Sequence, residues 1–363
     1  METCVDSAVR VIEVKAGPEL KQRLLDESLV QAGLTLKDRP TSKTRVVFDW
    51  SEVIFVDLAT IVWSLVLFDQ LKSQGYELLL RLPSPEKHGS DPWRVWSFLW
   101  RWRFFEALKC IDHPANIVPE NQISWLENGD SKYGVGHIED PDGNIQQAST
   151  NRLLEITSFI LKPDAFTTEE EARRVFDPYV ELWKKKIIVQ ALMNWCRWSE
   201  EEALKFVIKI VAAVLENAGE HSGGTWVLSA FSVDKKNLLL GFADNGNGIP
   251  DALRAFIDQN DGLKGRLGDM SDAALIKYFT EPDMIVDSEL IRVSTKGVLP
   301  TREGRLGRGL YYCKQMILEN DGELRIRSGS ACVEFTPNGK ETPSDELIRS
   351  CGTTLRVIIP RKD

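Results

Sequence analysis

Four short segments in the C-terminal half of the chain combine residue types that can bind a phosphorylated nucleotide. They are Asn217 in AVLENAGEHS, the run Asp244–Gly248 (DNGNG), the run Gly307–Gly309 (GRG), and the run Gly352–Thr354 (GTT). A D-x-G-x-G run alone is a common turn, and a lone G-x-G is a weak signal. The order of the four segments, and the element on which each falls, together predict an ATP pocket.

Asn217 lies near the end of a helix expected from about residue 200. An asparagine oxygen there can complete the ligand shell of Mg²⁺, which accepts few protein oxygens and keeps several waters. Asn217 shares a helical face with Ala213 and His221, one turn before and one turn after it. Taken alone, Asn217 is also explained as a polar residue at a helix end. The core-facing stripe of this helix is expected to be Leu204, Val207, Ile208, Val211, Leu215 and Ala218.

Asp244 directly follows an apolar strand, Leu238–Ala243. A carboxylate at a buried strand end can accept a hydrogen bond from the amino group of adenine. Gly246 and Gly248 let the backbone turn sharply and approach the base without a clash at Cβ. The plainer alternative is an ordinary turn rich in aspartate and asparagine.

The third segment precedes a helix expected over Leu310–Glu319. Gly307 and Gly309 expose backbone N–H groups at the N-terminus of this helix, where the helix dipole favours an anion such as phosphate. Arg305 and Arg308 add positive charge there, and each either binds phosphate or is merely solvated.

The last strand is expected over 352–360. It offers one threonine hydroxyl, from Thr353 or Thr354, to the adenine side of the pocket. The preference of threonine for strands explains the pair equally well.

The N-terminal half reads as a separate α/β domain. Strands are expected at 46–49 and 53–56, a helix over 58–74 that stops at Gly75, and a returning strand at 77–82. Strands that alternate with a helix predict a partly parallel sheet.

An aromatic stretch follows, with Trp93, Trp96, Trp100 and Phe104 at helical spacing beside several arginines. Such a helix either presents an aromatic and basic surface to nucleic acid or membrane, or packs its aromatic stripe on the preceding sheet. We favour packing, because the chain carries a net charge of -9.

Composition excludes several classes of protein. The hydrophobic content of 43% and charged content of 27% are typical of globular domains, and the acidic balance argues against nucleic acid as the main partner. The six cysteines form no C-x-x-C pair, and with only four histidines a zinc or imidazole metal site is not expected. No apolar stretch reaches the roughly 20 residues that span a bilayer, and the first residues lack a signal-peptide pattern. We therefore expect a cytoplasmic protein with reduced cysteines.

On these four segments, residues 166–363 resemble the GHKL superfamily, the Bergerat-fold ATPases. The resemblance implies an α/β sandwich with helices on one face of a mixed sheet, which binds Mg²⁺ and ATP. Asn217 resembles the Mg²⁺ ligand and Asp244 the adenine-reading carboxylate. Residues 260–306 would form the ATP lid. The full set of ATP-binding positions so expected is Asn217, His221, Asp244, Gly246, Gly248, Arg305, Gly307, Arg308, Gly309, Thr353 and Thr354.

The N-terminal domain, residues 1–112, is similar to STAS-like domains, and residues 113–165 are expected to connect it to the ATPase-like part. A STAS-like domain implies a protein partner. In phosphorylated members a serine follows the aspartate of the loop before the helix. Here Leu58 follows Asp57, so no phosphorylation switch of that type is expected.

One departure from the GHKL pattern bears on catalysis. Many relatives carry a carboxylate, the general base for hydrolysis, four residues before the Mg²⁺-binding asparagine. This position is Ala213, and a methyl group cannot deprotonate water, so we expect nucleotide binding with slow or absent hydrolysis.

The leading hypothesis is an intracellular regulator that binds Mg-ATP. ATP would order the glycine- and charge-rich segment 260–306 and favour a homodimer or a complex with a protein partner. Two alternatives stay open: an anti-sigma-type protein serine kinase, and a dimerising ATPase of the gyrase or MutL kind.

Overall fold

The computed structural model describes most of the chain. The described residues are 9–34, 39–83 except 41, 94–96, 98–99, 104, 108, 118–119, 137–139, 145–147, 153–160, 188–258 except 217–223, 225 and 235, 261–282, and 308–362 except 346. The chain divides into two compact units. The first comprises 1–148 with 348–350, and the second comprises 149–347 with 351–363.

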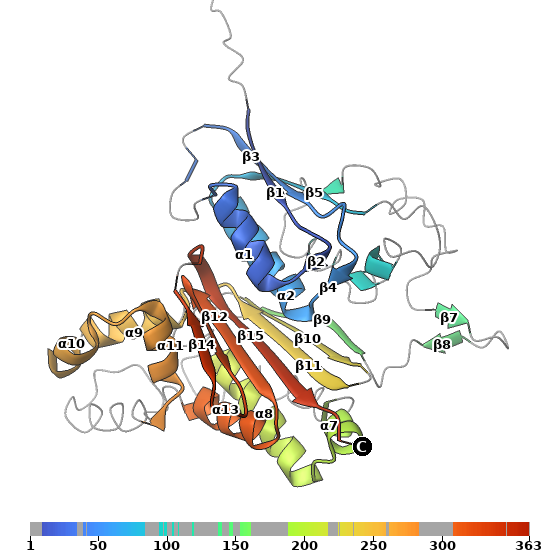
Figure 1. Ribbon diagram of the computed structural model, residues 1–363, viewed down its shortest axis with the longest axis vertical. Helices are drawn as coiled ribbons and strands as arrows, with labels where there is room; N and C mark the ends of the chain where they lie inside the picture. Colours follow the sequence, from blue (N-terminus) through green and yellow to red (C-terminus); the bar gives the residue numbers. More distant parts are fainter. Residues whose placement is uncertain are drawn as a thin grey trace, which may run out of the picture. The chain divides into compact units, whose positions relative to one another are not determined.

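The first unit contains a four-stranded sheet whose order is β1-β3-β5-β6 (Figure 1). All three strand pairs are parallel. The strands are β1 (Arg10–Lys15), β3 (Thr44–Asp49), β5 (Glu77–Arg81) and β6 (Val118–Pro119). The predicted strand, helix and returning strand over 46–82 are confirmed, and so is the parallel pairing.

Helix α2 (Leu58–Ser73) lies between β4 and β5 in sequence and is buried along most of its length. It is apolar on all sides, as expected of a helix enclosed by its own unit. The Asp57 side chain begins the helix by accepting a hydrogen bond from the backbone N–H of Thr60 at 3.1 Å. The other short elements are β2 (Glu19–Leu20) paired with β4 (Phe55–Val56), α1 (Gln22–Gln31), and the hairpin β7 (His137–Glu139) with β8 (Ile145–Gln147).

The aromatic stretch after β5 is described at a few positions. Phe104 is fully buried, and its ring centroid lies 6.0 Å from that of Trp50, which follows β3. Trp96 is partly buried and donates from Nε1 to the carbonyl oxygen of Pro83 at 2.6 Å. At these two positions the side chains pack within the unit, as the packing interpretation predicts. Trp93 and Trp100 lie outside the described residues.

The second unit contains a seven-stranded sheet with the order β14-β13-β12-β15-β11-β10-β9 (Figure 1). β11 pairs antiparallel with both β10 and β15, which makes it an interior strand. The strands are β9 (Leu153–Ile160), β10 (Trp226–Val233), β11 (Asn237–Asp244), β12 (Glu323–Gly329), β13 (Ala331–Phe335), β14 (Glu341–Ser344) and β15 (Ser350–Pro360). β9 lies within the range expected to connect the two domains.

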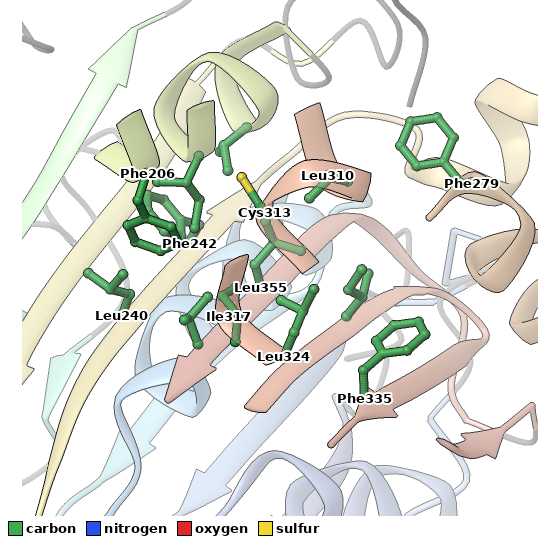
Figure 2. Packing of buried hydrophobic residues seen from close by; sticks show 14 of the residues in the cluster. Phe206, Leu240, Phe242, Phe279, Leu310, Cys313, Ile317, Leu324, Phe335 and Leu355 are labelled. Carbon is green, nitrogen blue, oxygen red and sulfur yellow. The ribbon is translucent and has the colours of Figure 1, made fainter. Parts of the chain in front are cut away.

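A layer of helices covers one face of this sheet. It contains α7 (Ile188–Cys196), α8 (Glu200–Glu216) and α13 (Arg308–Glu319). Figure 2 shows side chains of α8 and α13 gathered against inward-facing side chains of β11, β12 and β15. Three further helices, α9 (Ile249–Asp258), α10 (Asp261–Leu267) and α11 (Asp272–Phe279), contribute to the same core. The unit, like the first, is mixed α/β, which confirms the predicted class.

Helix α8 begins with a capping box. The Ser199 hydroxyl accepts from the Glu202 backbone N–H at 3.2 Å, and a Glu202 carboxylate oxygen accepts from the Ser199 N–H at 2.9 Å. The predicted helix start is therefore confirmed.

The predicted core stripe of α8 is confirmed at Val207 and wrong at Ile208. Ile208, which we expected in the core, is 42% exposed, and Leu204 is only partly buried. The buried row is Ala203, Phe206, Val207, Ile210 and Val214. Apolar residues occupy most of the positions in this helix, so several stripes fit the sequence. The large Phe206 ring, which packs edge-on against Trp198 at 5.2 Å, belongs to the stripe that is buried.

Part of the segment 260–306 also differs from expectation. Residues 261–267 and 272–279 are helices, and they bury Leu263, Leu267, Leu275, Ile276 and Phe279 in the core of the second unit. We did not expect a packed element here, and for this part that expectation is wrong, because its apolar residues are spaced to pack. Residues 283–307 lie outside the described residues. No helix in the described ranges is both long enough and apolar enough to cross a bilayer.

Candidate functional site

Asp244 is the last residue of β11, and its place in the strand points its side chain toward the helix layer. Side chains alternate between the two faces of a strand. Leu238, Leu240 and Phe242 all belong to the core beneath the helices, and Asp244 continues their row. Only 4% of Asp244 is exposed.

The alternation also separates the two threonines of β15. Leu355, Val357 and Ile359 belong to the helix-side core, so Thr353 lies on that face and Thr354 on the opposite one. Thr354 is buried and pairs in register with Ala243, whereas Thr353 is partly exposed. Of the two candidates, only Thr353 lies on the same face as Asp244.

Ser328, on β12, lies on the same face of the sheet as Asp244 and Thr353. Leu324 and Ile326 face the helix-side core, and Ser328 follows them in the same row. The Ser328 hydroxyl lies 2.9 Å from the Thr353 hydroxyl and accepts from the backbone N–H of Ile249, the first residue of α9, at 2.8 Å. Three strands and the start of a helix therefore meet at one polar cluster, formed by Asp244, Ser328 and Thr353.

The carboxylate of Asp244 is held by two backbone amides. Oδ1 accepts from the N–H of Gly246 at 2.9 Å, and Oδ2 accepts from the N–H of Thr353 at 3.2 Å. The first bond closes the turn after β11, and the second joins this turn to β15. The DNGNG and GTT segments, which are more than 100 residues apart, are thus parts of one structure.

Two glycines permit this close approach. Gly248 has a φ of 85°, and a Cβ at this position would lie 2.7 Å from Oγ of Ser328. Gly352 has a φ of 70°, and its Cβ would lie 1.7 Å from the carbonyl oxygen of Asp244. Any side chain at Gly352 would separate β15 from the end of β11, so the cluster depends on glycine there.

The electrostatic state of Asp244 is unusual. Burial raises the pKa of its carboxyl to about 7, although the amides of Gly246 and Thr353 act to lower it. In the described part of the chain, its hydrogen-bond partners are these two amides and no cation. The carboxyl group of Asp244 can accept a further hydrogen bond when it is ionised. Its ionised form is destabilised by burial.

A second buried aspartate lies nearby in the same unit. Asp272, the first residue of α11, is 5% exposed and accepts from the N–H and the hydroxyl of Ser330 at 2.8 and 2.7 Å. Its other oxygen lies 2.6 Å from a guanidinium nitrogen of Arg254 on α9. Burial acts to raise the pKa of Asp272, but the bonds from Ser330 and Arg254 outweigh it, and the pKa lies below its usual value.

The remaining expected site residues are described in part. Gly246 lies in the buried turn after β11, and Gly309 lies in the first turn of α13. Ala213 lies in α8 and Arg308 begins α13, but their side chains are outside the described set. Asn217, His221, Arg305 and Gly307 lie outside the described residues altogether. The structure thus brings together the DNGNG and GTT segments, and the placement of the expected Mg²⁺ ligand is untested. Among the described residues, no three His, Cys, Asp or Glu side chains form a group that would hold a metal ion.

The buried residues of α8 help to locate position 213 on this helix. This position is three residues after Ile210 and seven after Phe206, both of which are buried. Position 213 therefore lies within one turn of the buried residues Ile210 and Val214 of α8.

Ser328 was not among the residues expected from the sequence. The signal that would have found it is a serine at an inward position of a strand whose previous inward positions are apolar. Its partners, Ile249 and Thr353, are 79 and 25 residues away, so no local pattern indicates them.

No protein-family model matches the chain, and a search of curated proteins finds no significant match to it.

Proposed function

We propose that the chain is a regulatory protein that binds Mg-ATP on a C-terminal domain of the Bergerat type. The adenine base would lie against Asp244 and Thr353, between the seven-stranded sheet and its helix layer. Two features support the fold assignment. The order of the four nucleotide-binding segments follows the GHKL pattern, and α7, α8 and α13 lie on one face of a mixed sheet.

The observation that carries the proposal is the state of Asp244. A buried carboxyl without a cation is unfavourable unless a ligand compensates for it, and strongly shifted groups of this kind concentrate at functional sites. The exocyclic amino group of adenine is a suitable ligand, since it donates a hydrogen bond to the carboxylate. Asp244 is fixed by the amides of Gly246 and Thr353, so it is already oriented before a base arrives.

The phosphates would lie toward the start of α13, where Gly309 and the backbone of Arg308 begin the helix. A helix N-terminus favours an anion because its first N–H groups have no partner within the helix. Mg²⁺ would be held by Asn217 together with phosphate oxygens, and its chemistry when bound is to neutralise the charge of the phosphates. Residue 213 would lie where relatives place a general base. Because it is alanine, nucleotide would be bound without rapid hydrolysis.

In this proposal, the first unit is the part of the chain that binds the protein partner. Its parallel sheet and buried α2 agree with a STAS-like domain, and nucleotide bound in the second unit would change which partner, or which second copy of the chain, associates. Within the expected lid, the helices α10 and α11 bury apolar side chains in the core of the second unit. Any movement of the lid would therefore be largest outside these two helices.

Isothermal titration calorimetry on the full chain tests the proposal. With Mg²⁺ present, ATP and ADP should bind at micromolar strength or better. Asp244→Asn should weaken binding by about 1–3 kcal/mol, the usual cost of disturbing a buried hydrogen bond to a charged group.

The matched control is Asp258→Asn, which removes a charge from the far end of α9. Asp258 is 65% exposed, and its ion pair with Lys264 lies at the surface, so this variant should bind like the unmodified chain. Absence of nucleotide binding by the unmodified chain would refute the proposal, as would equal losses in the two variants.

A further inference from the structure

We infer that Ser328 is a specificity-determining residue. It fixes the direction in which the Thr353 hydroxyl proton points. The edge of the site that faces the base, formed by Asp244 and Thr353, then offers acceptors of hydrogen bonds and no hydroxyl donor. The inference rests on the proposed function and extends it, because it selects bases that carry an amino group at the edge facing Asp244. It follows from three hydrogen bonds at one hydroxyl.

The Ser328 hydroxyl has one proton and two lone pairs. The backbone N–H of Ile249 lies 2.8 Å from Oγ and can only donate, so it occupies one lone pair. The carbonyl oxygen of Gly352 lies 3.1 Å from Oγ and can only accept, so the single proton of Ser328 is committed to it.

The third contact then has only one possible direction. Oγ of Ser328 and Oγ1 of Thr353 are 2.9 Å apart, and one of them must donate. If Ser328 donated here, its oxygen and the carbonyl oxygen of Gly352 would face each other at 3.1 Å with no proton between them, which is repulsive. Thr353 is therefore the donor, and Ser328 uses both lone pairs and its proton.

This assignment leaves Thr353 without a free proton. Its hydroxyl oxygen retains acceptor capacity, and Thr353 is partly exposed on the helix side of the sheet, so a ligand can reach it. Asp244, on the same face, is also an acceptor when ionised. Above pH 7, where Asp244 is ionised, a base with an amino group at this edge finds two acceptors, whereas a base with a carbonyl there finds no donor.

The geometry around Ser328 holds this arrangement in place. Ile249 begins α9 and Gly352 lies in β15, so both partners belong to regular elements of the same unit. A Cβ at Gly248 would lie 2.7 Å from Oγ of Ser328, so the hydroxyl can occupy this position because residue 248 is glycine. The direction of the Thr353 proton is thus set by the fold before a ligand binds.

The test compares ATP with inosine triphosphate, which has a carbonyl in place of the amino group and an N1–H in place of the unprotonated N1 of adenine. Titrations of the unmodified chain should show tighter binding of ATP. Ser328→Ala frees the Thr353 proton to donate, so the ATP-to-ITP affinity ratio should fall by roughly 2–12-fold, the equivalent of one hydrogen bond.

A double-mutant cycle separates this effect from structural damage. In a Thr353→Val background there is no hydroxyl to direct, so adding Ser328→Ala should leave the ATP-to-ITP ratio unchanged. Ser330→Ala is the matched control, because it removes a serine hydroxyl two residues away that bonds to Asp272. It should lower thermal stability without changing the ratio.

The outcomes are distinguishable. If the unmodified chain binds neither nucleotide, the proposed function fails and the inference with it. If ATP binds but Ser328→Ala leaves the ratio unchanged, or changes it equally in the Thr353→Val background, the specificity role alone is refuted.

Discussion

Asp244 and Asp272 are two buried aspartates in the same unit, and their surroundings differ in one decisive respect. Each is at most 5% exposed and each accepts a backbone N–H bond. Asp272 also bonds to the guanidinium of Arg254, and its pKa lies below the usual value. Asp244 has only amide partners in the described part of the chain, and burial raises its pKa to about 7.

The difference distinguishes a carboxylate that is paired with a cation from one that, in the proposed function, binds the adenine base. Asp272 joins the start of α11 to Ser330 and to Arg254 on α9, so its charge is already compensated. Asp244 is positioned equally well, but no cation among the described residues compensates its charge, and a ligand with a donor group would do so. Burial alone does not distinguish the two residues; the presence of a cation does.

The largest expected effect comes from adding a carboxylate at position 213 of α8. If the site at Asp244 binds ATP, Ala213→Glu should raise the rate of hydrolysis by roughly 10²–10⁴-fold, the usual contribution of a general base. The measurement is phosphate release at saturating Mg-ATP.

Ile208→Glu is the control for Ala213→Glu, because it adds the same group on the exposed side of α8. It should leave the rate at the level of the unmodified chain. Brisk turnover by the Ala213 form would show that another residue serves as base, with Glu216 the first to test.

The second effect concerns stability and should fall on the other aspartate. Asp272→Asn leaves the charge of Arg254 without its buried partner, so we expect it to lower the free energy of unfolding by about 2–4 kcal/mol. Asp244→Asn removes a charge that no cation in the described part of the chain compensates, so without nucleotide it should not lower the free energy of unfolding by more than about 1 kcal/mol. Native-state hydrogen exchange of amides in β11 and β12 measures both. A larger loss in Asp244→Asn would show that the two carboxylates have the same structural role.

Much of the fold was predictable because its signals are local. The strands and helix over 46–82, the capping box at Ser199 and Glu202, and the apolar strand ending at Asp244 are all encoded within a few neighbouring residues. These signals depend on caps, turns and alternation, which act over one or two turns of chain.

Our predictions failed where the sequence allows more than one buried face and tertiary packing decides which face is buried. Helix α8 has apolar residues on several faces, and contact with the sheet decides that Phe206 is buried and Ile208 exposed. The range 260–306 is rich in glycine and charge on average, yet Leu263 and Ile276 are spaced to enter the core. An average over a long range conceals such positions.

The candidate site was predictable only in its individual pieces. Asp244 and Thr353 were expected, but the sequence could not choose between Thr353 and Thr354, which face opposite sides of β15. The role of Ser328 arises from bonds that cross 25 and 79 residues of sequence. Hydrogen bonds of this kind are consequences of strand order, which a single sequence does not state.

The last expected effect is the pH dependence of stability that is due to Asp244. Its pKa is about 7 in the folded chain and near 3.8 when unfolded, so the folded state binds the proton more tightly. This contribution to stability is present below pH 4 and is lost as the pH rises through 7. Asp272 has the opposite sign, because its lowered pKa gives stability that is lost only in acid.

The affinity for a ligand should also depend on the protonation of Asp244. An adenine amino group binds the ionised carboxylate, so at pH 6 binding must first expel a proton from most molecules. The affinity for adenosine, which has no phosphate to titrate, should therefore rise by about tenfold from pH 6 to pH 8. Calorimetry in two buffers of different ionisation enthalpy measures the proton released. Asp244→Asn should abolish both the release and the rise, and Asp272→Asn should preserve both. An adenosine affinity that is flat with pH in the unmodified chain would mean that Asp244 is not the group that contacts the base.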